Sequence, residues 1–112
     1  MRMRIFFFSL YCIITLLLLM KLAEANDNGK RIFMSNCISC HNKNPSQKGS
    51  VGPELTDTPL EVMRVKVTTG KYPKTFPKGY APKRKTSMMR AFPKLEKDVP
   101  DIYAYIQTFK KK

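Results

Sequence analysis

The five residues Cys37-Ile38-Ser39-Cys40-His41 constrain this chain more than any other segment, because they place two thiols and an imidazole within one short stretch of backbone. The pattern matches C-x-x-C-H, the attachment sequence of c-type haem. In that chemistry the two thiols form thioethers with one porphyrin, and the histidine directly after the second thiol ligates iron. The motif therefore predicts one covalent haem c, attached through Cys37 and Cys40, with His41 as the proximal iron ligand.

Three other chemistries use similar residues. A thioredoxin-like redox pair needs a βαβ context, and the chain has no strong strand pattern. Tetrahedral zinc needs four ligands, whereas outside Cys12 the chain offers only Cys37, Cys40 and His41 as soft ligands. A plain disulfide would leave His41, the only histidine of the chain, without a role. Haem attachment is the interpretation that uses all three side chains.

Residues 1–25 have the pattern of an exported protein. Met1-Arg2-Met3-Arg4 is a basic start, Ile5 to Met20 is an almost unbroken apolar run of 16 residues, and Ala23-Glu24-Ala25 fits an A-x-A cleavage site. These are the parts of a secretory signal peptide, and the run is short for a membrane span. We expect a signal peptide at 1–25, no stable membrane insertion after cleavage, and a mature domain at 26–112 in the periplasm or an equivalent extracytoplasmic compartment.

The mature chain is one small and strongly basic domain. Its 112 − 25 = 87 residues fit a single domain. Domains of this size usually need a cross-link or bound group to stabilise the fold, which a covalent haem would provide. Residues 1–25 carry three cations and one carboxylate, so their removal takes the net charge from +13 to +13 − 2 = +11. This strongly positive net charge suggests an acidic partner. Nucleic acid is disfavoured, because the chain is exported and has no nucleic-acid fold signature.

Capping residues and apolar spacing predict three helices in the mature chain. The first begins near Asn26-Asp27-Asn28, which are good N-caps, and runs to about Cys40. A loop over 42–57 follows. The second helix starts at Thr58-Pro59-Leu60-Glu61, with Thr58 as N-cap and Glu61 in a capping box, and stops at Gly70. The last has Asp98 as N-cap and an apolar stripe at helical spacing, formed by Val99, Ile102, Ile106 and Phe109.

The segment from Lys71 to Lys85 is expected to be irregular, because its three prolines exclude a regular helix. Aromatic residues alternate in it with cations, and a long loop in a small domain is often functional. Two compatible interpretations stay open: aromatic side chains that cover the haem, and lysines that dock a partner. The candidate docking cations are Lys71, Lys74, Lys78, Lys83, Arg84, Lys85, Arg90 and Lys94.

The chain has no second histidine, and the methionines beyond the signal peptide are the candidates for a second protein ligand to the iron. Met34 is too near Cys37 in sequence to reach the far face of the ring. Met63 belongs to a helical apolar stripe, which predicts core packing. Met88 and Met89 lie in a loop far along the chain that can fold over the ring. Met89 is the predicted distal ligand, with Met88 as the runner-up and an open site as the third alternative.

Taken with these motifs, the chain resembles the class I c-type cytochromes, a family of small soluble monohaem proteins. Gly29 and Phe33 match the family's Gly-x-x-x-Phe, Gly52-Pro53-Glu54-Leu55 resembles its Gly-Pro-x-Leu segment, Met89-Arg90-Ala91-Phe92 resembles its Met-Pro-x-Phe segment, and residues 101–106 resemble its last helix. The resemblance implies an all-α fold around one haem with the first and last helices crossing. It also implies that the Pro53 carbonyl orients His41. Arg90 stands where the family usually has proline.

The resemblance further implies single-electron transfer between extracytoplasmic redox enzymes through a His/Met-ligated haem, not enzymatic turnover. We expect a monomer that meets acidic redox protein partners through its lysine-rich surface. Three alternatives remain: a fixed cytochrome subunit of a larger oxidoreductase complex, a haem sensor with an open distal site, and a haem-free thiol protein.

Overall fold

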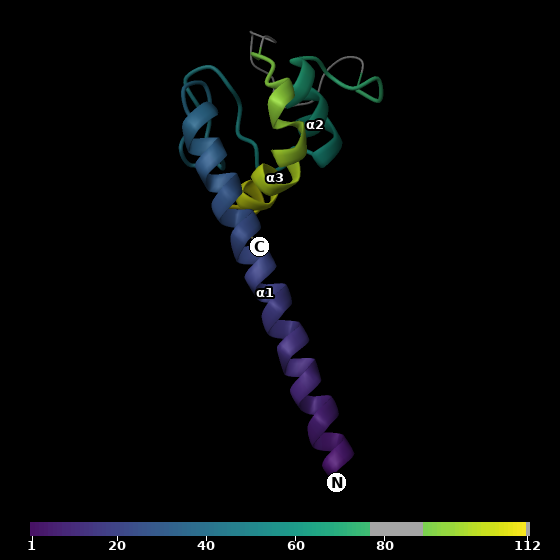
Figure 1. Cartoon of the computed structure of the whole chain (residues 1–112). Coiled ribbons are helices and arrows are strands. Elements are labelled where there is room, and N and C mark those ends of the chain that lie inside the picture. The colour runs from purple at the N-terminus through teal and green to yellow at the C-terminus, as the bar shows by residue number, and fades with distance from the viewer. Residues whose placement is uncertain (77–88, 112) are drawn as a thin grey trace.

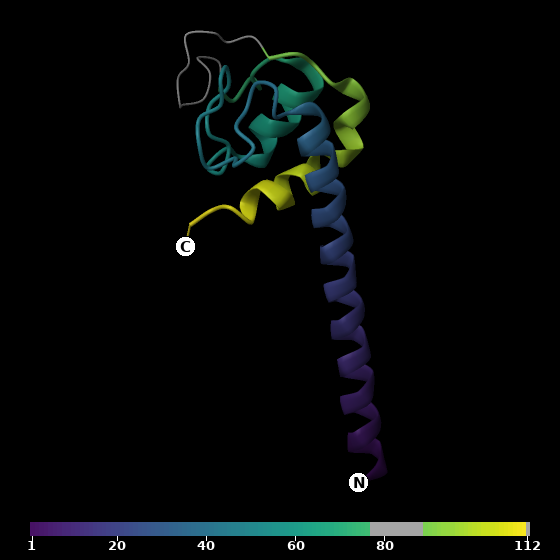
Figure 2. The same cartoon turned by 90° about the vertical axis from the view of Figure 1, so that its left-hand side faces the viewer.

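The computed structural model describes residues 1–76 and 89–111. Within these ranges the protein has helices and no strand: α1 (Arg2–Asn36), α2 (Leu60–Thr69), a 3-10 helix η1 (Pro93–Asp98) and α3 (Val99–Gln107). The expected all-α fold is therefore confirmed. Figure 1 shows α1 as a long rod whose C-terminal end enters a small head formed by the rest of the chain. Figure 2 shows the same rod and head from the side.

In the full chain α1 begins at Arg2, upstream of the start near Asn26 that was expected for the mature domain. No proline interrupts the chain between the apolar run and the motif, and Ala23-Glu24-Ala25 are strong helix formers, so one helix continues through both parts. Its buried residues are Gly29, Ile32 and Phe33 alone. An 18-residue window of α1 has a mean hydropathy of 2.4 and none of it is buried, so the helix is long and apolar enough to cross a membrane. A signal sequence has the same property.

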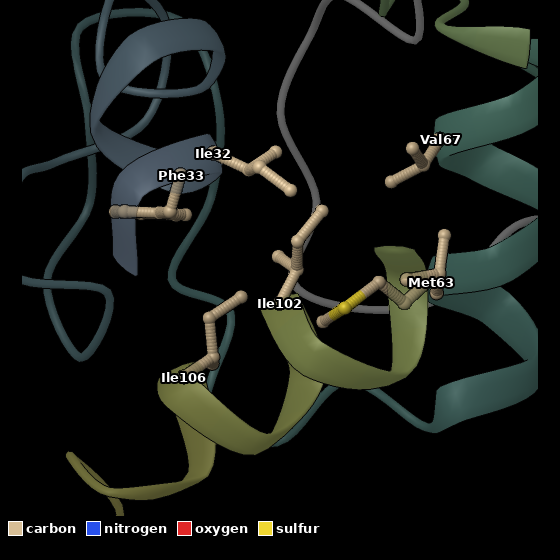
Figure 3. Close-up of a cluster of buried hydrophobic side chains, with 7 residues drawn as sticks. Ile32, Phe33, Met63, Val67, Ile102 and Ile106 are labelled. Carbon is tan, nitrogen blue, oxygen red and sulfur yellow. The ribbon is translucent and has the colours of Figure 1, made fainter. Parts of the chain in front are cut away.

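The core forms where α3 packs against α1 and α2, and its members on α2 and α3 keep helical spacing (Figure 3). Met63 belongs to it, as its apolar stripe predicted, and Phe33 is completely buried. Ile38, which follows the end of α1 at Asn36, is 40% exposed. We call the following residues the core cluster: Ile32, Phe33, Met63, Val67, Val99, Ile102 and Ile106.

α1 and α3 cross at Gly29, which confirms the predicted crossing of the first and last helices. A Cβ atom at Gly29 would lie 2.6 Å from the carbonyl carbon of Asp101, so the two backbones touch. Asn28 Nδ2 donates hydrogen bonds to Asp98 Oδ1 (3.2 Å) and Asp101 Oδ2 (2.8 Å). Asp98 is the N-cap residue of α3, as predicted, but its carboxylate binds α1 and makes no capping bond within its own helix.

α2 begins one residue later than predicted, with Pro59 as N-cap. The expected capping box is absent, because the Glu61 carboxylate accepts a hydrogen bond from Thr75 Oγ1 (3.0 Å). The predicted end is confirmed: Gly70 adopts the left-handed conformation (φ 72°), which favours glycine, and its N–H binds the Lys66 carbonyl at 2.8 Å.

Candidate functional site

The two thiols and the imidazole follow directly on the last turn of α1. The amide of Cys37 donates to Phe33 O (2.9 Å), and the amides of Cys40 and His41 both donate to Cys37 O (3.3 and 2.9 Å). Helical hydrogen bonding thus continues through the motif, although α1 itself ends at Asn36, earlier than predicted. Both cysteines are unpaired thiols, Cys37 half-buried and Cys40 exposed.

His41 is buried and oriented by a backbone carbonyl. Its Nδ1 lies 3.0 Å from Pro53 O. A carbonyl can only accept, so Nδ1 carries the proton and Nε2 keeps the lone pair that a metal needs. Burial lowers the pKa of His41 below its ordinary value, opposed by the hydrogen bond to Pro53. The imidazole is therefore held in the neutral form that ligates metals. The hydrogen bond implied by the family resemblance is present, and the ligand role of His41 stays a prediction.

Residues 49–53 pass so close to His41 that glycine is required. The amides of Val51 and Gly52 both donate to Cys40 O (3.0 and 2.8 Å), and the amide of Gly49 donates to Gly52 O (2.9 Å). A Cβ at Gly52 would lie 2.8 Å from His41 Nε2 and nearer still to Nδ1 and Cε1. Pro53 was predicted from the sequence to contact His41, and Gly52 was not predicted as a site residue. Its only signal was the Gly-Pro pair itself.

The electrostatics of the thiols argue against the alternative chemistries. Burial, helped by the neighbouring Cys40 thiol, raises the pKa of Cys37 to about 11. Redox-active cysteines have lowered pKa values because the thiolate is the reactive form, so a thioredoxin-like role is not supported. Residues 1–76 and 89–111 contain no group of three His, Cys, Asp or Glu side chains suited to a metal ion. Two free thiols beside one neutral, oriented imidazole form a donor set that fits haem c.

One polar atom next to the histidine loop lacks a partner. Glu54 Oε2 is buried and accepts no hydrogen bond from the described residues. Glu54 directly follows Pro53, whose carbonyl binds His41. Buried atoms of this kind are costly, and in native proteins their explanations include backbone strain, a redox role and a bound water or ion. Sequence reasoning treated Glu54 only as the variable residue of the Gly-Pro-x-Leu segment.

Met89 packs against the same core as the attachment motif. Its half-buried side chain and that of Cys37 both contact the core cluster. Met88 lies outside the described residues, so its rank as runner-up stays open. Lys78, Lys83, Arg84 and Lys85 also lie outside them. The other four candidate docking cations are exposed: Lys71, Lys74, Arg90 and Lys94.

Comparison with known proteins identifies one family. The cytochrome c family model matches residues 26–110, which is most of the chain. The matched region contains the two thiols and His41, the loop that ends at Pro53, and Met89. Neither the curated proteins nor the solved structures give a match.

Proposed function

The chain belongs to the cytochrome c family, whose members carry covalent haem c and generally act as electron carriers, and we propose that it is a single-electron carrier between extracytoplasmic redox enzymes. When bound, the haem supplies a reversible one-electron iron couple. The observation that carries this proposal is the His41 Nδ1 to Pro53 O hydrogen bond at 3.0 Å, directly after two unpaired thiols. This arrangement leaves Nε2 free to bind a metal.

Each residue of the site has a defined part in this proposal. Cys37 and Cys40 hold the porphyrin through thioethers. His41 is the proximal ligand, and Pro53 fixes its tautomer and makes it a stronger base. Met89 is the distal ligand, with Met88 as the runner-up. Ligation of the haem iron by both a methionine and a histidine would raise its reduction potential.

The same proposal assigns the basic surface to partner docking. No carboxylate occurs between Lys71 and Lys94, and the four described cations of this stretch are exposed. A surface whose charges are all positive attracts negatively charged partners and raises the rate of encounter with them. We therefore propose acidic redox proteins as partners of a monomeric mature domain at 26–112, released into the periplasm or an equivalent compartment, with no nucleic-acid ligand.

An optical and mass analysis of the exported protein tests the site. From a host competent in haem attachment, the intact mass should exceed that of the polypeptide by one haem, and the gain should survive acid–acetone extraction. The oxidised form should show the weak near-infrared band of methionine–iron ligation, and Met89→Ala should abolish it.

The alternatives give different outcomes in the same experiment. A colourless product would favour a haem-free thiol protein. Rapid carbon monoxide binding by the reduced form would favour an open-site sensor, and copurification in a stable complex would favour a fixed subunit. If Met88→Ala abolishes the near-infrared band and Met89→Ala does not, the ligand is Met88.

A further inference from the structure

The C-terminal turn of α2 contacts the backbone of residues 89–92 at two points. At one point, a Cβ atom at Gly70 would lie 2.6 Å from the Met89 carbonyl oxygen, so the two backbones approach more closely than a Cβ would allow. At the other, the amide of Phe92 donates to Val67 O at 2.6 Å. That carbonyl is one of those that a helix end leaves without an intrahelical donor.

The helix end that makes these contacts is itself well anchored. Val67 belongs to the core cluster. Lys66 Nζ donates to the Gly70 carbonyl at 3.1 Å and lies 4.2 Å from the centroid of the Tyr72 ring, a cation–π contact. Gly70 is the only described residue with a positive φ. The turn therefore has one defined geometry, set by the packing of α2 on one side and by the Lys66 contacts on the other.

Met89 needs such an anchor because the residue after it provides little restraint. Proline at that position would fix its own φ near −65° and keep the preceding residue extended. Arg90 imposes neither restriction, and its guanidinium carbon lies 5.8 Å from the Phe92 ring centroid on an otherwise exposed side chain. The backbone around Met89 is instead restrained from outside, by α2.

We propose that the C-terminal turn of α2, through Gly70 and Val67, positions Met89 for iron ligation and takes over the part that a following proline would play. The inference rests on the proposed function, because it takes Met89 as the distal ligand. Gly70 is then a positioning residue for two reasons: it ends the helix in the left-handed conformation, and its missing Cβ leaves room for the Met89 carbonyl.

Two substitutions at Gly70 separate these reasons. Gly70→Ala opposes the left-handed conformation and adds a Cβ. Gly70→Asn adds the same Cβ, but asparagine adopts the left-handed conformation at lower cost. Val62→Ala is the control for lost stability, since Val62 is a buried α2 residue (2% exposed) outside the core cluster against which Met89 packs. Met89→Ala is the reference for complete loss of the ligand. All four variants are made in the full chain, exported and loaded with haem.

The measurements are the near-infrared methionine–iron band and the affinity of the oxidised protein for added imidazole. External ligand binds in proportion to the fraction of molecules whose methionine is displaced, so we expect both Gly70 variants to weaken the band and to bind imidazole about tenfold more tightly or better. Val62→Ala should unfold at lower denaturant and keep the band. If Gly70→Ala fails to accumulate, Gly70→Asn carries the test.

The failures can be told apart. If both Gly70 variants keep the band and the imidazole affinity of the unaltered protein, the turn does not position Met89 and the proposal is wrong. If Gly70→Asn keeps both and Gly70→Ala does not, the left-handed helix end positions Met89 and the missing Cβ does not. The proposal is also wrong if Val62→Ala loses the band to the same extent, because general destabilisation then explains the effect. If Met89→Ala keeps the band, the ligand assignment itself is wrong and the positioning proposal falls with it.

Discussion

At the scale of single residues, the haem-binding roles of Cys37, Cys40 and His41 stay predictions that rest on spacing along the chain, which a sequence displays directly. Gly52 was not predicted, because its role depends on a contact with His41, eleven residues earlier, that exists only after the loop folds back. A similar argument applies to Gly70, which was predicted as a helix end but not as a neighbour of Met89. A glycine that is required because it has no side chain is hard to recognise as a site residue from the sequence alone.

Gly52→Ala tests the close passage of the loop beneath His41. The added methyl group meets the imidazole ring, so the ring or the loop must move and the hydrogen bond to Pro53 O should lengthen. We expect a loss of about 1–3 kcal/mol in the unfolding free energy of the haem-loaded protein, with a shifted reduction potential. Denaturant titration followed by haem absorbance, together with redox titration, measures both.

The neighbouring exposed Val51 supplies the control, since Val51→Ala should change neither quantity by much. If Gly52→Ala changes neither the unfolding free energy nor the reduction potential, the His41 imidazole can accommodate an added methyl group and the loop does not pass closely beneath it.

At the scale of elements, helix ends were predicted within a few residues where the sequence has a clear capping residue, as at Gly70 and Asp98. The hydrogen-bond partners of the side chains near these helix ends were not predictable. The Glu61 carboxylate binds Thr75 and the Asp98 carboxylate binds Asn28, because tertiary partners became available that local rules do not include. In the full chain α1 starts upstream of Asn26, because good N-caps mark a helix start only where no helix already precedes them. The 3-10 helix η1 had no clear periodic signal.

Gly29→Ala tests the α1–α3 crossing. A Cβ there meets the Asp101 carbonyl group, which is backbone and cannot rotate away, so the helices must separate and loosen the core cluster around Phe33 and Ile102. We expect a loss of about 2–3 kcal/mol or more in unfolding free energy, the upper part of the range for overpacking. Ser35→Ala, on an exposed part of the same helix, should stay within about 0.5 kcal/mol of the unaltered protein. Equal unfolding midpoints for the two variants would show that the crossing is not tight.

At the scale of the whole molecule, the structure separates into a projecting half-helix and a head. The longest dimension is 66 Å because the N-terminal part of α1 extends away from the other helices (Figure 1). The large apolar side chains of residues 1–22 are exposed there, whereas the buried residues of α1 begin at Gly29. Removal of residues 1–25 would therefore leave every core contact in place.

We accordingly predict that cleavage follows Ala25 and that the product is soluble and stably folded around its haem. After cleavage the first turn of the shortened helix contains Asn26 and Asp27, which suit a helix N-terminus. N-terminal sequencing of the exported protein should begin at Asn26. A mature protein that starts at Met1 and sediments with membranes would instead make α1 an anchor and the chain a tethered cytochrome.

The basic stretch from Lys71 to Lys94 should act as a local docking surface, beyond the effect of net charge. Lys71, Lys74 and Lys94 are exposed, so their reversal to Glu leaves the core intact. The control reverses Lys110, Lys111 and Lys112 and changes the net charge by the same 3 × 2 = 6 units. Among the described residues it breaks the ion pair of Lys110 with Asp57 at 3.4 Å, which is exposed and contributes little.

Electron exchange with an acidic redox protein, measured by stopped flow at several salt concentrations, distinguishes a local patch from overall charge. Steering by a patch depends on where the charges lie, so the Lys71, Lys74 and Lys94 variant should exchange electrons about tenfold more slowly than the tail variant at low salt. The gap should close as the screening length falls to about 10 Å near 0.1 M salt. Equal slowing of both variants would assign the effect to net charge. No slowing in either would mean that the partner is not acidic, in which case the excess of lysine serves solubility or a membrane surface.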